Sequence, residues 1–481
     1  MKVTFRNLGV ISEAEIDLKQ LTVFVGPNNS GKTWLAYALA GIFGSYGFTQ
    51  YIKAYTEEEG VSRTYPLLDD AVERVLTGGT ATIDLVQFAE KYGETYFNNI
   101  ARFARSWMPQ FMSTREASFE HLAVSVHLAE TKKVLLDRIL SYFLRSEISG
   151  SPQRPSLSIR KKRGERNLYV YTSSEYTSEE QIAMQLPPDV IREYLVHSAL
   201  EALHRALYPF VYVLPMERTT FITFPFGGVV VSGEPVLMKE LSSQERNRKA
   251  VIKPVGNFLS MISSVFKNEL EGKTQREREA KNNPKIKEYI QLAELLEKQI
   301  LSGDVKFSQP ESESMSHTQL DPARELLFQA EEDSRLEISI ASSMVKELSP
   351  LVLYLRYLAR PGELLVIDEP EMNLHPEAQA KITEFLAMLV NAGLNILVTT
   401  HSPYLVDHLT NLIKAADVED KESIRNEFYL KRTDAFVSKE KVSVYLFDQG
   451  RATKAMGEDG VIDLNTFGEV SDRLSEIYFK L

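Results

Sequence analysis

The chain has 481 residues, of which 43% are hydrophobic and 25% charged, with a net charge of -11 and no cysteine. This composition is typical of a folded globular protein and excludes disulfide scaffolds, thiolate metal sites and cysteine nucleophiles. The negative charge argues against nucleic-acid binding over the whole surface, but it leaves room for local basic stretches. The chain has no apolar run long enough to span a bilayer and no signal-peptide pattern, so we expect a cytoplasmic protein without a membrane partner.

The first predicted elements are strands that lead into a glycine-rich turn. Two alternating segments within residues 3–18 are followed by a nearly continuous apolar run over 21–25, as expected of a buried strand. A helical pattern covers residues 33–43, directly after the turn. Helical patterns then dominate residues 49–207, interrupted by a predicted β-hairpin over 156–172.

The middle of the chain mixes several patterns. We predict a strand over residues 210–214, a second hairpin over 227–237 and charged helices over 242–301. Residues 302–319 hold few apolar side chains and are predicted to form a surface loop.

The last third of the chain alternates strands with helices. The predicted strands cover residues 364–367, 396–399 and 442–447, the last of them being the final strand, and the helices cover 376–392, 403–415 and 467–478. This alternation predicts an α/β fold with a mostly parallel sheet that is covered by helices on both faces.

The glycine-rich turn fits the pattern G-x-x-x-x-G-K-[ST], with Gly26, Pro27, Asn28, Asn29, Ser30, Gly31, Lys32 and Thr33. Glycines let the backbone wrap closely around phosphates, and the following helix N-terminus adds positive potential. Lys32 would reach the β- and γ-phosphates, and the hydroxyl of Thr33 would bind Mg²⁺. The turn lies between a strand and a helix, as a nucleotide-binding loop requires.

Two later strands end in polar residues suited to the same chemistry. The strand over 364–367 ends in Asp368 and Glu369, which suit Mg²⁺ binding and activation of an attacking water. The strand over 396–399 ends near His401, which is placed to contact the γ-phosphate or that water.

Together these motifs resemble an ABC-type ATPase of the non-transporter branch, which includes RecF, the Rad50 and SMC heads, and OLD-family ATPases. OLD-like ATPases occur in anti-phage defence systems such as PARIS and Septu. The resemblance covers residues 1–45 and 335–450. It implies an ATPase head formed by residues 1–48 and 335–481, with a largely helical inserted subdomain over 49–334. The insert lacks heptads, which argues against a long coiled coil, and we expect no fused TOPRIM nuclease.

The resemblance also implies roles for individual residues, with ATP and Mg²⁺ as cofactors. Thr33 and Asp368 would bind Mg²⁺, Glu369 would be the general base and His401 the switch histidine. Residues 373–376 would lie at a dimer interface, and Ser343 would be the signature serine that completes the partner's site. Glycine usually follows that serine, whereas Met344 and Val345 stand here; the alternative is that residues 342–343 only cap a helix.

Arg218 belongs to a Pro-x-x-Arg turn that also resembles OLD-like ATPases. It would sense nucleotide, anchor the insert or form a structural salt bridge. Two basic stretches are candidates for nucleic-acid contact. One contains Arg160, Lys161, Lys162 and Arg163, and the other runs from Arg246 to Lys287. The alternative for both is a solvated hairpin tip and a solvated helix face.

The resemblance favours a nucleotide-gated homodimer or higher homo-oligomer that acts as sensor or scaffold for an effector in anti-phage defence. That effector would be a nuclease or toxin in trans. One alternative is a RecF- or Rad50-like DNA-repair ATPase that binds DNA directly. Another is a nuclease with its active site in the insert, and a third is a scaffold with negligible turnover.

Overall fold

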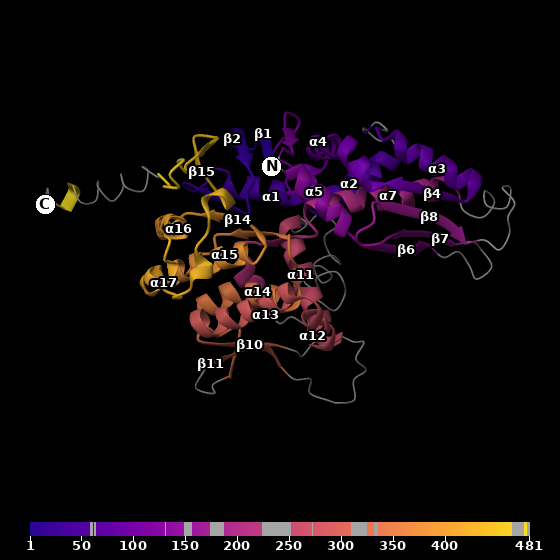
Figure 1. Ribbon diagram of the computed structural model, residues 1–481. Helices are drawn as coiled ribbons and strands as arrows, with labels where there is room; N and C mark the ends of the chain where they lie inside the picture. Colours follow the sequence, from indigo (N-terminus) through magenta and orange to yellow (C-terminus); the bar gives the residue numbers. More distant parts are fainter. Residues whose placement is uncertain are drawn as a thin grey trace, which may run out of the picture. The chain divides into compact units, whose positions relative to one another are not determined.

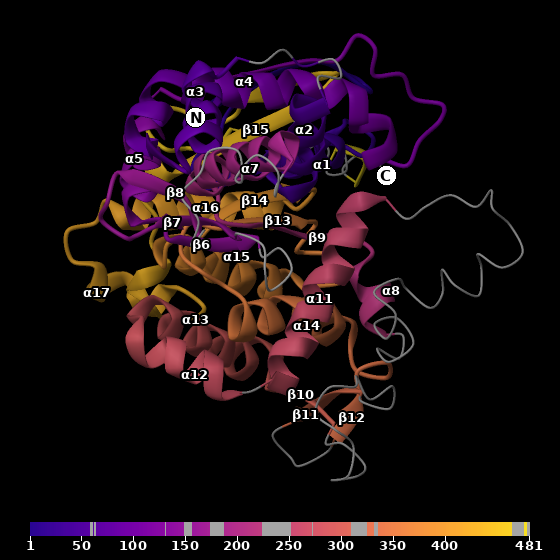
Figure 2. The same ribbon diagram turned by 90° about the vertical axis from the view of Figure 1, so that its right-hand side faces the viewer.

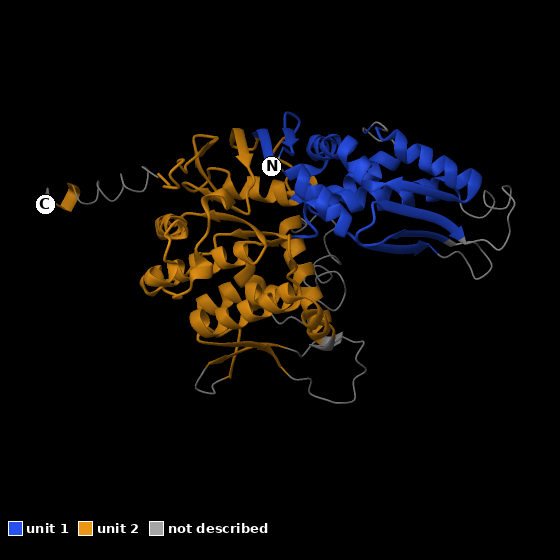
Figure 3. Cartoon of the chain, viewed as in Figure 1, with its two compact units in different colours: residues 1–7, 41–108, 119–211 blue, residues 8–40, 109–118, 212–481 orange. Residues whose placement is uncertain are grey.

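The described residues divide into two units, each presented by itself (Figure 3). Unit 1 comprises residues 1–7, 41–108 and 119–211, and unit 2 comprises residues 8–40, 109–118 and 212–481. A computed structural model describes residues 1–57, 61, 64–129, 131–148, 156–173, 187–223, 252–271, 273–308, 325–330, 335–463 and 476–478. Within them, no helix is both long and apolar enough to cross a membrane.

Unit 2 is built on a mixed, mostly parallel sheet (Figure 1). Its strands follow the order β2 (Ile11–Asp17), β16 (Arg451–Lys454), β15 (Val442–Asp448), β3 (Leu21–Val25), β14 (Asn395–Thr400), β13 (Leu364–Asp368) and β9 (Val211–Leu214). Strand β3 pairs in parallel with both β14 and β15, and β13 pairs in parallel with β14. The hairpin partner β16 is antiparallel to β15 and parallel to β2.

The register brings the carboxyl ends of three strands to one edge of the sheet. Val25 of β3 lies opposite Thr400 of β14, and Thr399 lies opposite Asp368 of β13. The residues that follow these strands therefore meet at the same edge, where parallel sheets place their ligand sites.

The central strands of unit 2 are buried on both faces, as their continuous apolar runs predict. Every residue of β3 and β13 is buried. One face packs into a shared core with the helices α11 (Lys253–Glu271), α13 (Pro284–Leu295), α14 (Ser343–Tyr357), α15 (Pro376–Asn391) and α16 (Pro403–Ala416). Figure 2 shows α14 next to both α11 and α13.

Local signals set where the helices after β13 and β14 begin. His375 caps α15 and Ser402 caps α16, each through a side-chain atom that accepts a backbone N–H, and each is followed by proline at the first helical position. The remaining helices of unit 2 are α1 (Lys32–Phe43, of which residues 41–43 belong to unit 1), α8 (Arg218–Thr223), α12 (Lys273–Asn282), α17 (Lys421–Ile424), a π-helix (Leu296–Leu301) and short 3-10 helices at Arg425–Glu427, Thr433–Ala435 and Lys439–Lys441. An antiparallel sheet contains β10 (Gly303–Phe307), β11 (Leu326–Ala330) and β12 (Arg335–Glu337).

Unit 1 combines helices with antiparallel strands. Its helices are α2 (Ser45–Glu57), α3 (Pro66–Gly78), α4 (Leu85–Phe111), α5 (Thr131–Ser141) and α7 (Pro188–Leu207). Four strands form one sheet in the order β4 (Thr80–Asp84), β8 (Asn167–Ser173), β7 (Ser156–Lys161) and β6 (Leu144–Ile148), and β1 (Lys2–Leu8) pairs with β5 (Ala123–His127). Much of its core is aromatic, because Tyr51, Tyr65 and Tyr96 are fully buried.

The predicted α/β class with a mostly parallel sheet is confirmed, as are the hairpin over 156–172 and the strand over 210–214. Three predictions are wrong in detail. Strands β4, β5 and β6 interrupt a stretch expected to be helical, residues 303–307 form β10 instead of a loop, and β16 follows the strand expected to be last. The predicted hairpin over 227–237, residues 309–319 of the predicted loop and most of the closing helix lie outside the described residues. The boundaries at residues 48 and 334 stay predictions.

Candidate functional site

The predicted phosphate loop lies between β3 and α1, at the carboxyl edge of the sheet in unit 2. Two of its glycines are required by close contacts and positive φ angles. A Cβ on Gly26 (φ 147°) would lie 2.3 Å from the carbonyl oxygen of Phe447 in the neighbouring strand. A Cβ on Gly31 (φ 96°) would lie 2.7 Å from the Ile11 side chain. A side chain at Gly26 would displace the backbone of Phe447, and one at Gly31 would displace the Ile11 side chain, and both φ angles are strained for any residue with a Cβ.

Lys32 lies at the centre of this loop. Its ammonium donates to the carbonyl oxygens of Gly26 at 2.9 Å and Pro27 at 2.8 Å, and the residue is only 4% exposed. Burial lowers the pKa of Lys32 to about 8, although the carboxylates of Glu369, Asp368 and Glu371 oppose that shift. The loop therefore concentrates a positive charge and several backbone N–H groups around one small volume.

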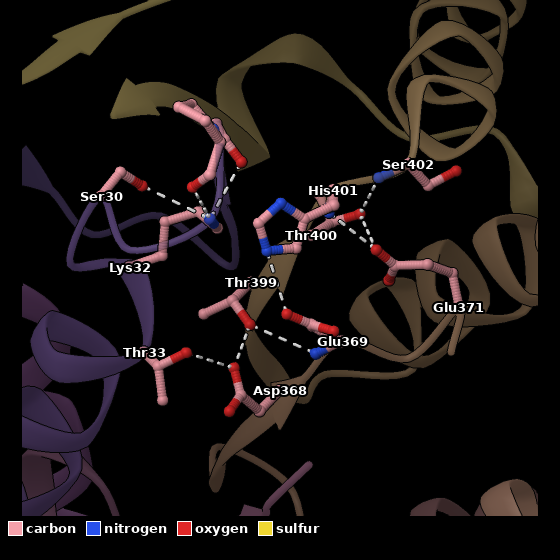
Figure 4. A network of polar contacts seen from close by, with 12 residues as sticks. Ser30, Lys32, Thr33, Asp368, Glu369, Glu371, Thr399, Thr400, His401 and Ser402 are labelled. Carbon is pink, nitrogen blue, oxygen red and sulfur yellow. Dashed lines mark hydrogen bonds and ion pairs between the residues drawn. The ribbon is translucent and has the colours of Figure 1, made fainter. Parts of the chain in front are cut away.

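Asp368 is the buried carboxylate at the end of β13 (Figure 4). Its Oδ1 accepts from the Thr33 hydroxyl at 3.0 Å and from the Thr399 hydroxyl, and its Oδ2 accepts from the Tyr37 hydroxyl at 3.0 Å. Burial raises the pKa of Asp368, while these hydrogen bonds lower it. The adjacent oxygens of Thr33 and Asp368 are hard donors of the kind that Mg²⁺ prefers, so the pair fits this ion.

Glu369 and His401 form a second pair at the same edge (Figure 4). His401 Nε2 lies 3.0 Å from Glu369 Oε1, and both side chains are partly exposed. The hydrogen bond from His401 is the main cause of a lowered pKa of Glu369, and burial opposes it. Glu369 thus presents an ionised carboxylate that can accept a proton.

Glu371 is a site residue that the sequence patterns did not single out. Its buried Oε1 accepts from the Thr400 hydroxyl at 2.6 Å and from the backbone N–H of His401 at 2.7 Å. Burial raises the pKa of Glu371, and the Thr400 and His401 hydrogen bonds lower it. The acidic run that begins at Asp368 contained this residue, but its partners in the next strand are visible only in the fold.

The glycine-rich loop, Glu369 and His401 line one cavity of about 800 Å³ in unit 2. The lining residues are Gly9, Val10, Asn28, Asn29, Ser30, Gly31, Lys32, Thr33, Trp34, Met216, Glu369 and His401. The volume suits a ligand of nucleotide size. Among the described residues, no group of three or more histidine, aspartate or glutamate side chains is placed to hold a metal ion.

Two residues with predicted roles, Ser343 and Arg218, do not line this cavity. Ser343 begins α14 with an exposed side chain, and Ser342 is the helix N-cap, accepting from Val345 N at 3.4 Å. The capping alternative therefore applies to Ser342 and leaves Ser343 free for another role. Arg218 is buried and forms an ion pair with Glu347, which favours the structural alternatives over direct nucleotide sensing.

The basic stretches are less exposed than the sequence indicated. Lys161 is buried and donates to the carbonyl oxygens of Leu140, Tyr142, Lys162 and Glu165, so it cannot face nucleic acid. Arg160, Lys162 and Arg163 are exposed. In the second stretch Arg276 is buried against the carbonyl oxygens of Arg356 and Ala359, and Arg246 lies outside the described residues.

Two segments of the chain match family models. Residues 1–74 match a family described as "AAA ATPase domain", and residues 244–407 match one described as "AAA domain, putative AbiEii toxin, Type IV TA system". Both segments are therefore similar to AAA-family ATPase domains. The matched segments contain the phosphate loop, the Asp368–Glu369 pair and His401. They confirm an ATPase-type domain, while the narrower OLD-like subtype stays a prediction. No curated protein matches the chain.

Several solved structures are similar over most of their length, at low identity. The SMC head domain from Thermotoga maritima is 12% identical, covering 95% of this chain and 98% of that chain, with a TM-score of 0.31. A Smc head domain with an extended coiled coil bound to the C-terminal domain of ScpA, from Pyrococcus furiosus, is 12% identical over 99% and 98%, with a TM-score of 0.32. The recombination mediator protein RecF is 11% identical over 94% and 97%, with a TM-score of 0.31.

Proposed function

We propose that the chain binds ATP with Mg²⁺ and hydrolyses it in the cavity at the carboxyl edge of the unit 2 sheet. The observation that carries this proposal is that two pairs of side chains, Thr33 with Asp368 and Glu369 with His401, lie at the same glycine-rich loop. The Thr33 hydroxyl and Asp368 carboxylate lie 3.0 Å apart, and the Glu369–His401 pair lines the same cavity as the glycine-rich loop. This is the arrangement that phosphoryl transfer to water needs.

Each residue has a distinct task in this proposal. The loop N–H groups and the Lys32 ammonium bind the phosphates, and Thr33 with Asp368 would hold the metal ion. Mg²⁺ held by these two residues would neutralise negative charge on the phosphates. Glu369 accepts a proton from the attacking water, and His401 orients the Glu369 carboxylate and keeps it ionised.

The test compares ATP binding and turnover in three proteins. The wild type should bind ATP and release phosphate, Glu369→Gln should bind ATP but lose turnover by about 100-fold or more, and Lys32→Met should lose binding. Glu422→Gln is the matched control, because that carboxylate is exposed and pairs only with Arg425 among the described residues. A wild type that does not bind ATP would refute the proposal.

For the output of the site, we propose a nucleotide-gated homodimer or higher homo-oligomer that holds or releases an effector, either a nuclease or a toxin. The exposed Ser343 at the start of α14 supports a contact with a partner copy. The description of the family matched by residues 244–407 names a toxin and a toxin–antitoxin system, which supports a link between this chain and such a system. Affinity purification of Glu369→Gln with ATP, followed by identification of bound protein and nucleic acid, tests both parts.

A second candidate is direct DNA binding, as in a DNA-repair ATPase. It is favoured by the exposed Arg160, Lys162 and Arg163 beside the turn between β7 and β8. DNA should then stimulate ATP turnover, and replacing these three residues by glutamine should abolish the stimulation without changing turnover in the absence of DNA. Replacement of Lys132 and Lys133 in α5 is a control for general loss of positive charge.

A further inference from the structure

Arg218 is a fully buried arginine in unit 2, only 1% exposed, at the first position of α8. Buried arginines are rare, because each of the five N–H donors of the guanidinium needs a partner away from water. Arg218 does not line the nucleotide-sized cavity, although Met216 two residues earlier does. Its role therefore has to follow from its contacts inside the unit.

Those contacts use the whole guanidinium. Nη1 donates to the carbonyl oxygens of Pro215 at 2.8 Å and Asp368 at 2.6 Å, and Nη2 donates to that of Glu369 at 2.9 Å. Nε donates to the carbonyl oxygen of Glu347 at 3.3 Å, and Nη2 also forms an ion pair with the Glu347 carboxylate. Two of these acceptors are the main chain of the acidic pair, at the point where β13 ends.

Glu347 in α14 is the carboxylate that pairs with the Arg218 guanidinium. Its side chain is fully buried, and Arg218 is the cation that pairs with it among the described residues. Burial raises the pKa of Glu347 to about 7, with Arg218 opposing the shift. The charges of Arg218 and Glu347 are mutually dependent, because a buried charge that loses its partner is strongly destabilising.

The main chain that Arg218 binds is in an unfavourable conformation. Glu369 has a φ of 49°, in the left-handed region, which is sterically unfavourable for a residue with a Cβ. Its N–H donates to the carbonyl and hydroxyl oxygens of Thr399 at 3.1 and 3.2 Å, and its carbonyl accepts from Arg218. Strained residues persist only where the surroundings fix them from several sides, as here.

We propose that Arg218, held by Glu347, is a positioning residue that fixes the main chain of Asp368 and Glu369 and thereby aims the Glu369 carboxylate at the attacking water. This inference rests on the proposed ATPase function and assigns a role within that site. Displacing a general base by even about 1 Å can cost about 100-fold in rate while leaving substrate binding intact. Arg218 thus acts on turnover through Glu369, without touching the nucleotide.

The experiment measures kcat, the KM for ATP and thermal stability for three variants. Arg218→Lys keeps the charge but cannot make the forked contacts, so kcat should fall by about tenfold to 100-fold while KM changes less than about twofold. Arg218→Met leaves Glu347 unpaired and should lower the Tm as well. In the double variant Arg218→Met/Glu347→Gln the Tm should recover in part, because neither member of the pair is then a buried charge without its partner. The main-chain carbonyl oxygens still lack their donor, so kcat should stay low.

Arg356→Lys is the matched control, because it alters another arginine–glutamate pair on the same helix. Arg356 pairs with the buried Glu297 and donates to the carbonyl oxygen of Val305 at 2.7 Å, away from Asp368 and Glu369. This variant should lose stability but keep its kcat. If Arg218→Lys does not fold, Glu347→Gln supplies the kcat comparison, with a smaller expected fall.

The outcomes separate this inference from the proposed function. A wild type without ATP turnover would refute the proposed function, and the positioning role would fall with it. A wild type that turns over ATP, alongside Arg218 variants that lose stability but not kcat, would overturn the positioning role alone. A rise in KM as large as the fall in kcat would also overturn the positioning role, because Arg218 would then act on nucleotide binding.

Discussion

His401 and Glu369 lie 3.0 Å apart, Nε2 to Oε1, at the ends of the neighbouring parallel strands β14 and β13. The register of the sheet brings them together, since Asp368 pairs with Thr399, and Glu369 and His401 follow that pair by one and two residues. The contact with His401 is the main cause of the lowered pKa of Glu369. The histidine thus controls the charge of the proposed base as well as its direction.

We therefore expect His401→Ala to change the pH dependence of turnover. Without the histidine the pKa of Glu369 rises, so the acid limb of the kcat profile should move to higher pH, where the carboxylate becomes ionised. At neutral pH kcat should fall by about tenfold or more. His127→Ala is the control, because that histidine pairs with Glu94 on the surface of unit 1. An acid limb identical to that of the wild type would contradict the coupling.

Lys32 gives a second pH prediction, for binding instead of turnover. Burial lowers its pKa to about 8, and the proposed phosphate binding requires the protonated form. Between pH 7 and pH 9 the protonated fraction falls from about nine-tenths to about one-tenth, so ATP affinity should fall by about tenfold. Equilibrium binding across this range checks the value. Lys32→Met should bind weakly at every pH, and Lys19→Met should follow the wild-type curve. If the ATP affinity of the wild type stayed the same up to pH 9, this prediction would be wrong.

The site could be predicted from the sequence where its signals are local. The glycine spacing of residues 26–31 and the apolar runs that end at Asp368 and near His401 each lie within a few consecutive residues, and strand parallelism places them at one edge. The roles of Arg218 and Glu371 depend on partners in other strands and helices. No local pattern predicts that Arg218 donates to Asp368, which is 150 residues away.

The errors have the same physical origin. The basic run around Lys161 suggested an exposed surface, but the pleat of β7 turns Lys161 inward, where four carbonyl oxygens satisfy its ammonium. The strands β4 and β6 have five residues each, so their alternating burial is too short to stand out from the helical patterns on either side. Pairing with neighbouring strands then decides their structure.

Ser343 allows a test of the proposed dimer. Its side chain is exposed at the first position of α14, so Ser343→Arg should leave the fold and ATP binding unchanged. In the Glu369→Gln background, ATP should produce dimers or larger homo-oligomers, and the bulk of the added arginine should prevent this by a steric clash at the partner's site. Light scattering after gel filtration measures the mass. Ser264→Arg, on the exposed side of α11, is the control. Unchanged ATP-dependent assembly of Ser343→Arg would remove Ser343 from the interface.

Two substitutions of Glu371 test whether its carboxylate acts as a hydrogen-bond acceptor or through its negative charge. Its Oε1 accepts from both the Thr400 hydroxyl and the His401 backbone N–H, and glutamine offers an oxygen at the same place. Glu371→Gln should therefore keep kcat within about threefold of the wild type, at some cost in stability for its buried amide N–H₂. Glu371→Ala leaves both donors unpaired, which should cost about 1–3 kcal/mol of stability per group and should lower kcat by about tenfold as His401 loses its anchor.

Steady-state kinetics and thermal unfolding of both variants decide between these roles. Glu377→Ala removes an exposed glutamate from the first turn of α15, where it pairs with Lys381, and should change neither quantity appreciably. If glutamine and alanine at position 371 lower kcat equally while stability differs, the negative charge of Glu371 acts on the site. If only alanine lowers kcat, the carboxylate acts by holding the strand end that carries His401, and the acidic run from Asp368 to Glu371 then contains one metal ligand, one base and one anchor.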